Sequence, residues 1–243
     1  RDAGTPVLVE KPLAATVEEA REIVEAATAA SLVLAVGHIE RFNAAVAELP
    51  KWVERPIHIR AERISPYSPR ILDGVVLDLM IHDIDIVLSL AGDAEVVHVS
   101  GVGQHARSAS EDLASAIVRF DSGLTATFTT SRLGQQKIRQ VEITQADSVV
   151  VADLLRQDIT VHRMSRHEYL SDEGARYRQS SMMEIPFLDT RGEPLALELE
   201  HFAECARTGA TPRVDGAAGL RALALARDID AALSRSTDTE PVP

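Results

Sequence analysis

The sequence predicts an α/β portion followed by a larger α+β portion with a mostly antiparallel open sheet. Two observations predict the first portion: short apolar runs at 7–9 and 32–38, and a helical pattern between them. A third predicts the second portion, because alternating segments separated by turn signals follow one another from residue 56 onward. We therefore expect a parallel strand–helix–strand unit within 1–40 and a sheet-based domain over 41–243.

Each element of the N-terminal unit has its own signal. The strand run at 7–9 is bounded by prolines, and Thr16 with Glu19 forms a capping box that starts a helix over 16–31. Residues 32–38 form the second strand. A buried parallel strand needs neighbours, and almost no sequence precedes the first strand, so we expect the chain to begin inside a domain.

The second portion alternates helices and strands. A helical segment at 41–54 comes first, and the long apolar stretch 74–92 predicts a buried helix. The predicted strands are 56–65, 94–103, 114–120, 124–132, 138–155 and 158–164, with a hairpin turn at Asp121-Ser122-Gly123. The polar stretch 165–192 predicts a loop region. Helices at 194–208 and 215–234 complete the prediction.

Composition and charge exclude several classes of function. The net charge of −12 argues against nucleic acid and against an anionic membrane surface as partners. No apolar run reaches the roughly 20 residues that a membrane-spanning helix needs. Cys205 is the single cysteine, so no internal disulfide forms, and no leader pattern is present. A cytoplasmic protein fits these features best.

Four ionisable groups interrupt the apolar segment GVVLDLMIHDIDIVLSLAG, residues 74–92. On an α-helix Asp78, His82 and Asp85 lie on one stripe, and Asp83 falls off it. A buried charge without a partner costs several kcal/mol, so the stripe must face partners, water or a ligand cleft. Asp78 and His82 are one turn apart, and a carboxylate beside an imidazole raises its basicity, which makes His82 a candidate general base.

Two other interpretations of this stripe stay open. The Asp78–His82 pair could satisfy itself as a structural contact while Asp85 caps a neighbouring loop, and the helical pattern alone favours this interpretation. The other interpretation is a zinc site. No further His or Cys is placed to complete a tetrahedral ligand set, so we expect no metal.

A second group of polar residues follows the first predicted strand. The sequence VEKPL places Glu10 and Lys11 just past the end of that strand. Ligands of doubly wound folds bind at the carboxyl ends of the strands. A lysine there presents a positive charge or, with a depressed pKa, a proton donor or acceptor. The alternative is a surface lysine in a strand-to-helix loop.

Together these segments resemble the glucose–fructose oxidoreductase / inositol dehydrogenase family. The resemblance rests on EKP after a strand, then GHIERFN, then D-x-x-x-H-D-x-D on a helix, in this order. It implies that 1–40 is the remnant of an NAD(P)-binding Rossmann domain and that 41–243 is a substrate-binding and oligomerisation domain. The segments GHIERFNAAV and TTSRLGQQKIRQVEI also resemble a subset described as UDP-N-acetylglucosamine 3-dehydrogenase-like proteins.

The resemblance further implies an enzyme that uses NAD or NADP to oxidise a secondary hydroxyl of a sugar or nucleotide sugar, such as the 3-hydroxyl of a UDP-N-acetylhexosamine, to a ketone. His82 would take the hydroxyl proton, Lys11 would lie between nicotinamide and the reacting carbinol, and Asp78 would orient His82 or contact a sugar hydroxyl. The implied cofactor-binding residues are Glu10, Lys11, His38 and Arg41, and the implied substrate-binding residues are Asn43, Arg132, Lys137 and Arg139. The basic ones could hold a diphosphate, or they could pair with carboxylates at the surface.

The family's G-x-G-x-x-G motif is absent from the sequence. GVGQHA at 101–106 lacks the third glycine, lies in the second portion and is not followed by an obvious helix. We therefore expect the chain alone to bind NAD poorly and to be inactive. Alternatives are an inositol or simple-sugar dehydrogenase, and a non-catalytic sugar-binding or regulatory protein on the same fold. The large open sheet suggests a homodimer or homotetramer.

Overall fold

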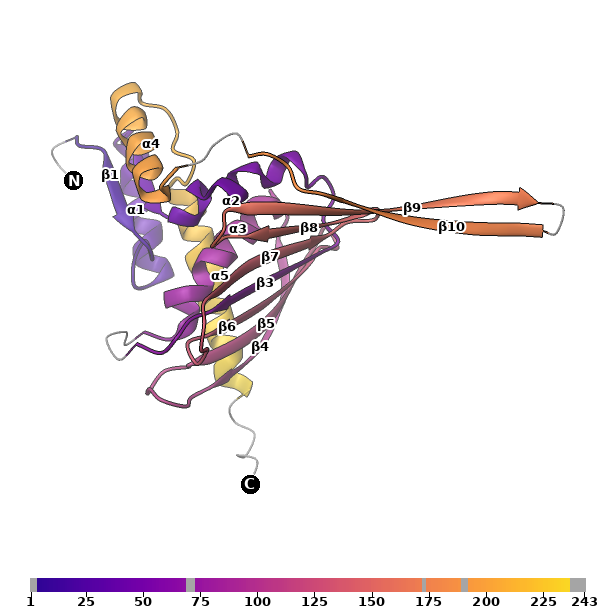
Figure 1. The fold of residues 1–243 in the computed structure, drawn as a ribbon. Helices are drawn as coiled ribbons and strands as arrows, with labels where there is room; N and C mark the ends of the chain where they lie inside the picture. The colour runs from indigo at the N-terminus through magenta and orange to yellow at the C-terminus, as the bar shows by residue number, and fades with distance from the viewer. Residues whose placement is uncertain (1–3, 69–72, 172–173, 189–191, 237–243) are drawn as a thin grey trace.

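The structure of the chain is a computed structural model that describes residues 4–68, 73–171, 174–188 and 192–236, without the side chains of 164–179. It contains a two-stranded parallel sheet and an eight-stranded sheet. The helices lie at one side of the larger sheet, and a long hairpin extends from the other end (Figure 1). This arrangement confirms the predicted α/β portion followed by an α+β portion.

The N-terminal unit has the predicted order of elements. Strand β1 (Val7–Glu10), helix α1 (Val17–Ala29) and strand β2 (Leu34–Gly37) follow one another, and β1 pairs with β2 in parallel. The capping box is present, because the amide of Glu19 donates to Thr16 Oγ1 at 3.2 Å and the amide of Thr16 donates to the Glu19 carboxylate at 3.0 Å. Strand β2 is buried, but β1 is only half-buried, since it has one strand neighbour among the described residues.

Short helical segments connect this unit to the large sheet, as the pattern at 41–54 predicts. They are the 3₁₀ helix η1 (Ile39–Phe42), helix α2 (Ala44–Glu48) and the 3₁₀ helix η2 (Leu49–Lys51). Asn43 starts α2, because its side-chain oxygen accepts a hydrogen bond from the amide of Ala45 at 3.1 Å.

The large sheet has the order β10-β9-β8-β7-β3-β6-β5-β4. Every neighbouring pair is antiparallel except β3 and β6, which run parallel. Its strands are β3 (His58–Ile64), β4 (Val96–Gln104), β5 (Leu113–Phe120), β6 (Thr125–Ser131), β7 (Ile138–Thr144), β8 (Ser148–Asp153), β9 (Asp158–Ser171) and β10 (Gly174–Glu184). The first residues of GVGQHA belong to β4, so this segment is not a phosphate-binding loop.

The prediction of a loop over 165–192 is wrong for most of that stretch. Strands β9 and β10 pair from Val161↔Glu184 to Ser171↔Gly174 and form the arm that Figure 1 shows leaving the sheet. Met182 and Met183 are 65% and 64% exposed, and adjacent strand residues point to opposite faces. The arm has no buried face at that point. A pattern that detects strands by one apolar face therefore cannot detect it.

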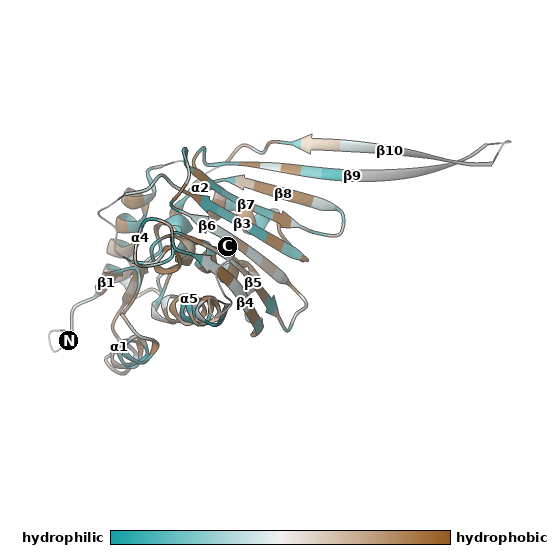
Figure 2. Cartoon of the chain, turned by 90° about the horizontal axis from the view of Figure 1, so that it is seen from below, coloured by the Kyte–Doolittle hydropathy of each residue, from teal (hydrophilic) through white to brown (hydrophobic). Residues whose placement is uncertain are grey.

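One face of the large sheet is covered by helices. Figure 2 shows the labelled helices on one side of the sheet, with none drawn over the opposite side. Helix α3 (Ile81–Ala91) and helix α5 (Gly216–Ser236) pack against the covered face. The core between these layers contains alternate strand residues and one face of each helix, among them Ile59, Ala116, Phe128, Val141, Ile84, Val87, Leu225 and Ile229.

The C-terminal part of the chain returns to the N-terminal unit. The amide of Val36 in β2 donates to the carbonyl of Val214 at 3.0 Å, and Ala35 forms a bridge with Asp215. Leu223 of α5 and Leu197 of helix α4 (Pro194–Thr208) pack into the same small core as Leu13, Ala20 and Val36. The first 40 residues therefore do not pack as a separate body, and the boundary near residue 40 stays a prediction.

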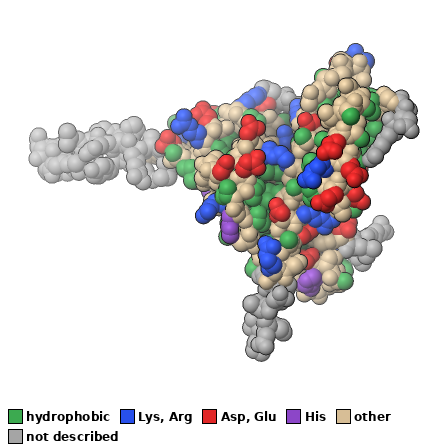
Figure 3. Space-filling model, turned by 180° about the vertical axis from the view of Figure 1, so that it is seen from behind, with side chains coloured by type: hydrophobic (Ala, Val, Ile, Leu, Met, Phe, Trp, Pro, Cys, Tyr) green, Lys and Arg blue, Asp and Glu red, His purple; other side chains and the backbone are tan. Residues whose placement is uncertain are grey.

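Charged side chains of both signs share one face of the surface (Figure 3). Acidic and basic side chains are interspersed over the face seen in Figure 3, so no single-sign patch dominates that face. No helix among the described residues combines the length and the apolarity that crossing a membrane requires.

Candidate active site

The polar segment predicted as one helix starts with a π-helical turn. The π-helix η3 (Val76–Met80) leads directly into α3, and both are surrounded by core residues. A π-turn contains more residues per turn than an α-helix and is frequent at functional sites. Asp78 lies within this turn and His82 lies after it. The single α-helical stripe expected for Asp78, His82 and Asp85 is therefore interrupted.

Lys11 is the ionic partner of Asp78. Its ammonium group donates a hydrogen bond to the Asp78 carbonyl at 2.5 Å, lies 3.4 Å from the Leu77 carbonyl, and lies 3.8 Å from Asp78 Oδ1. Burial lowers the pKa of Lys11, while the charge of Asp78 acts in the opposite direction. Asp78 Oδ2 is buried and has no hydrogen-bond partner among the described residues. Lys11 thus lies against the π-turn, next to a buried Asp78 oxygen that has no described hydrogen-bond partner.

His82 is half-buried, and its surroundings favour the neutral imidazole. Burial lowers its pKa well below the usual value, and the positive charges of Arg63 and Lys11 lower it further. No hydrogen bond joins Asp78 to His82 among the described residues, and His82 Nδ1 has no partner there. The expected effect of Asp78 on the basicity of His82 therefore stays a prediction. A neutral imidazole is nevertheless the form that accepts a proton.

His38 lies at the carboxyl end of β2 and faces His82. The two rings meet edge to face, with centroids 6.3 Å apart and planes at 85°. His38 is 1% exposed, and neither ring nitrogen has a hydrogen-bond partner among the described residues. Burial, followed by the charges of Arg41 and Lys11, lowers the pKa of His38 to about 4. Two unsatisfied buried nitrogens indicate that a bound molecule or water belongs beside this ring.

Glu10 completes the group at the carboxyl ends of the two parallel strands. It lies opposite Gly37 in the register of β1 and β2. A Cβ atom at Gly37 would lie 2.9 Å from Glu10 Oε2, so glycine leaves the space that this side chain occupies. The structure thus gathers Glu10, Lys11, His38 and His82 at one edge of the parallel pair, where ligands of such sheets bind.

Arg41 borders this group but is already paired. It lies 3.3 Å from Asp85 Oδ1, and burial raises the pKa of Asp85 to about 7 although Arg41 opposes that shift.

Arg213 was missed by the sequence analysis. Its guanidinium donates to the Arg41 carbonyl at 3.0 Å and lies over the Phe42 ring at 4.9 Å. No motif in the sequence placed Arg213 near residues 41 and 42.

Asn43 is used inside the fold. It is buried, caps α2, and donates to the carbonyl of Leu154 at 2.8 Å. These contacts make it a structural link between α2 and the segment after β8. The structure does not place its amide among the residues at the carboxyl ends of β1 and β2.

The three basic residues predicted to hold a diphosphate have different surroundings. Arg132 is buried and lies 3.4 Å from Asp112, and it donates to the backbone carbonyls of Asp73 and Glu111. Arg139 pairs with a buried carboxylate, that of Glu40, at 3.2 Å. Lys137 is exposed. The structure therefore does not bring Arg132, Lys137 and Arg139 together as one anion site.

A buried ionic cluster was also missed by the sequence analysis. Arg63 makes two hydrogen bonds to the Asp83 carboxylate, at 2.9 and 2.7 Å, and one to Glu40 at 2.9 Å. The signal was present in the sequence. Alternation along 56–65 places Arg63 on the same face as Ile59 and Ala61, and an arginine on an apolar strand face needs buried partners.

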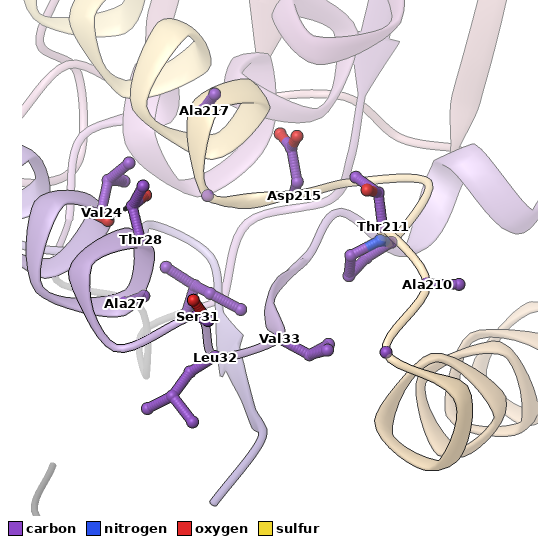
Figure 4. Close-up of a pocket in the computed structure, with 14 residues that line it drawn as sticks. Val24, Ala27, Thr28, Ser31, Leu32, Val33, Ala210, Thr211, Asp215 and Ala217 are labelled. Carbon is purple, nitrogen blue, oxygen red and sulfur yellow. Dashed lines mark hydrogen bonds between the residues drawn. The ribbon is translucent and has the colours of Figure 1, made fainter. Parts of the chain in front are cut away.

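The cavity shown in Figure 4 lies away from this site. It has a volume of about 210 Å³ and is lined by the end of α1, the turn before β2 and the start of α5. Thr28 and Ser31 face it from one side, and Asp215 from the other. It lies at the amino end of β2, opposite to His38. Among the described residues, no group of three or more His, Cys, Asp or Glu side chains could hold a metal ion.

Family models match nearly the whole chain. Residues 66–243 match the model for the oxidoreductase family, C-terminal alpha/beta domain, of glucose–fructose oxidoreductase and inositol dehydrogenase. The chain belongs to this oxidoreductase family. Residues 2–38 match the family's NAD-binding Rossmann-fold model, so the first 38 residues are part of a nicotinamide-dinucleotide-binding domain.

Several members of the family are similar to the chain. It is 32% identical to UDP-N-acetylglucosamine 3-dehydrogenase of Acidithiobacillus ferrooxidans, over 95% of this chain and 72% of that protein. A solved structure of that enzyme superposes with a TM-score of 0.86 over 98% of this chain and 74% of the other. The chain is 31% identical to scyllo-inositol 2-dehydrogenase (NAD(+)) of Bacillus subtilis, over 87% of this chain and 63% of that protein. A levoglucosan dehydrogenase complex with NADH and L-sorbose, 19% identical, shares the fold with a TM-score of 0.75 over 96% of this chain and 72% of the other.

The residues present fit the nicotinamide end of the family's cofactor. Among the described residues, His38 has two buried ring nitrogens without hydrogen-bond partners and Asp78 has one such carboxylate oxygen, while Gly37 leaves room for the Glu10 side chain beside them. His38 lies at the carboxyl end of β2, and Lys11, which follows β1, contacts Asp78, so these atoms lie where dinucleotide-binding sheets place their ligands.

Proposed function

We propose that the chain forms the catalytic and substrate-binding part of an NAD(P)-dependent dehydrogenase that oxidises a secondary hydroxyl of a sugar or nucleotide sugar, such as the 3-hydroxyl of a UDP-N-acetylhexosamine, to a ketone. One observation carries the proposal. Lys11, His38 and the half-buried His82 lie together at the carboxyl ends of two parallel strands that match an NAD-binding Rossmann-fold model. Similarity to UDP-N-acetylglucosamine 3-dehydrogenase supports the nucleotide sugar as substrate class.

His82 acts as the general base in this proposal. The cofactor, when bound, supplies the acceptor for the hydride that leaves the carbinol carbon. The hydroxyl proton passes to His82, which its surroundings hold in the neutral form, and the carbinol becomes a ketone. Lys11 places a positive charge near the oxygen as it loses its proton, and Asp78 balances that charge between turnovers.

Glu10 and His38 contact the nicotinamide end of the cofactor, and Arg41 borders it. Both NAD and NADP remain possible cofactors, because the acidic or basic residue that selects between them lies beyond these elements. Lys137 is the candidate for a diphosphate among the three basic residues, since it is exposed whereas Arg132 and Arg139 hold carboxylates. We further place the enzyme in the cytoplasm, as a homodimer or homotetramer that associates through the open sheet.

The substitution His82→Asn tests the catalytic assignment in the whole protein. We expect it to lower kcat with a UDP-sugar by about 10²–10⁴-fold, because a positioned base contributes on that order. The dissociation constant of the cofactor should stay nearly constant, as measured by fluorescence titration of NADH. The control is His98→Asn, an exposed histidine on β4, which should leave kcat unchanged. Full turnover in the His82 variant would refute the assignment.

An inositol dehydrogenase is the second candidate, because the chain is 31% identical to scyllo-inositol 2-dehydrogenase (NAD(+)). Reduction of NAD and NADP should be measured with UDP-N-acetylglucosamine, scyllo-inositol and myo-inositol under the same conditions. A higher kcat/KM with the nucleotide sugar supports the first proposal, and a higher value with either inositol supports the second. No reduction with any secondary alcohol would favour a non-catalytic sugar-binding protein.

A further inference from the structure

Three buried charged side chains and one partly exposed arginine form a cluster next to His82, and the proposed chemistry does not use them directly. They are Glu40, Arg63, Asp83 and Arg139. Arg63 forms a two-pronged ion pair with Asp83, at 2.9 and 2.7 Å, and a third hydrogen bond to Glu40 at 2.9 Å. Arg139 approaches the same Glu40 oxygen at 3.2 Å. Arg63 is 1% exposed, so its charge is held inside the protein.

The cluster connects the elements that build the active site. Arg63 lies on β3 near the centre of the large sheet, Glu40 lies in η1 just after His38, and Asp83 directly follows His82 on α3. A planar guanidinium that binds both oxygens of one carboxylate fixes direction as well as distance. The Arg63–Asp83 pair therefore fixes the rotation of α3 at the residue next to the proposed base.

The same arginine acts on His82 electrostatically. After burial, the charge of Arg63 is the largest cause that lowers the pKa of His82, and Lys11, His38 and Arg139 follow. Burial alone would lower the pKa of Arg63, but Asp83 and Glu40 outweigh it, so the guanidinium stays charged. The titratable groups around His82 are Lys11 after β1, His38 after β2, Glu40 in η1, Arg63 on β3, Arg139 on β7, and Asp78 and Asp83 on its own helical segment.

We propose that the Arg63–Asp83 pair positions the catalytic base. The two hydrogen bonds between Arg63 and Asp83 orient His82, and the positive charge of Arg63 keeps the His82 ring neutral. The inference rests on the proposed function, because it assigns His82 the role of base. Neither residue touches the reacting atoms, so both act through His82.

The test separates charge from shape by using two variants of the same pair. Both Arg63→Met and Asp83→Asn remove the ion pair, but only Arg63→Met removes the positive charge. In Arg63→Met the acid limb of the kcat/KM–pH profile should move to higher pH by roughly one unit, because His82 loses a neighbouring like charge. Asp83→Asn and Arg63→Lys keep the positive charge at position 63, so the acid limb of their profiles should not move to higher pH. Their kcat should still fall, because the two parallel hydrogen bonds of the Arg63–Asp83 pair are lost.

The control is Arg60→Met, which removes another arginine–carboxylate pair from the same strand. Arg60 lies on the opposite face of β3 and donates to Glu142 at 3.0 Å, away from the cluster. We expect both its profile and its kcat to match those of the parent protein. If the Arg63 and Asp83 variants lose activity equally at every pH, the pair is structural only and the inference is wrong. Arg63→Lys and Asp83→Asn suffice for this comparison if Arg63→Met does not fold, since any upward shift in them would also refute it.

A second readout does not depend on activity. The imidazole nitrogen signals of His82, assigned in histidine-labelled protein by their loss in His82→Asn, report its protonation during a pH titration. They should stay those of a neutral ring to lower pH in the parent protein and in Asp83→Asn than in Arg63→Met. Equal titration in all three would overturn the inference. Because NMR needs no substrate, that result is distinguishable from failure of the proposed dehydrogenase function.

Discussion

At the scale of single residues, the site depends on Lys11 being charged next to a helical turn that offers it carbonyl oxygens. Lys11 and Asp78 are 67 positions apart in sequence, and no local pattern connects them. The sequence could predict that each residue is unusual, because each is polar beside apolar elements. It could not predict that Asp78 pairs with Lys11 rather than His82, because partners so far apart in sequence are chosen by tertiary packing.

Replacing Lys11 tests this pairing. Lys11→Met should lower kcat by about 10²-fold or more, because one preorganised charge or donor near a developing negative charge contributes on that order. Lys51 provides the control, since it also pairs with a carboxylate, Glu48 at 2.8 Å, but is exposed on η2. Steady-state kinetics should show Lys51→Met to be indistinguishable from the parent. A Lys11→Met protein with unchanged kcat would exclude a catalytic role for the ammonium group.

At the scale of elements, the sequence predicts the helices and strands whose apolar residues repeat with the period of a buried face. Strands β3, β5 and β6 alternate, and α1 has a capping box, so all were expected. The π-turn η3 was not, because four of the residues 76–80 are apolar and this pattern fits either helical form. Helix α4 was expected as well, but no pattern in its residues predicts that Glu198 is buried. That carboxyl lies near Glu10, and one of its oxygens lacks a described partner.

The burial of Glu198 predicts how the free energy of unfolding depends on pH. Burial, followed by the nearby charge of Glu10, raises its pKa from 4.5 to about 7 in the folded chain. The folded state therefore binds more protons than the unfolded state between these values, and the free energy of unfolding falls as pH rises through that window. Glu198→Gln should raise the melting temperature at pH 8 and lose this advantage near pH 4.5.

Thermal unfolding followed by circular dichroism measures this difference. Glu200→Gln is the matched control, because Glu200 is exposed on the same helix. It should leave the melting temperature close to that of the parent at both pH values. Equal melting temperatures of the Glu198 variant and the parent at pH 8 would contradict the burial of a charged carboxyl at this position.

At the scale of the whole molecule, the order of the two portions was predictable because parallel and antiparallel strands leave different hydropathy patterns. The arm of β9 and β10 was not, since backbone pairing between polar strands leaves no such pattern.

The chain spans 72% and 63% of the length of two relatives, and it contains no G-x-G-x-x-G motif. The proposed nicotinamide end of a dinucleotide site thus lies in a chain whose sequence contains no such glycine motif.

The absence of that motif from the 243 residues predicts weak cofactor binding by this chain. Backbone amides of a glycine-rich turn at a helix N-terminus hold the pyrophosphate, and this chain offers no equivalent. Isothermal titration calorimetry should therefore give a dissociation constant for NAD⁺ at least about 100-fold higher than that of a protein with the complete dinucleotide-binding domain. Equal affinity would show that the pyrophosphate contacts are dispensable.

The return of the C-terminal segment to β2 has a consequence for folding during synthesis. Leu13, Ala20 and Val36 pack against Val214 and Leu223, so this small core closes only with residues that are translated long after them. Contacts of such long sequence separation form slowly. These contacts of β1 and β2 therefore form only after the whole large sheet has been translated. Apolar surface that stays exposed for that long favours aggregation and chaperone binding.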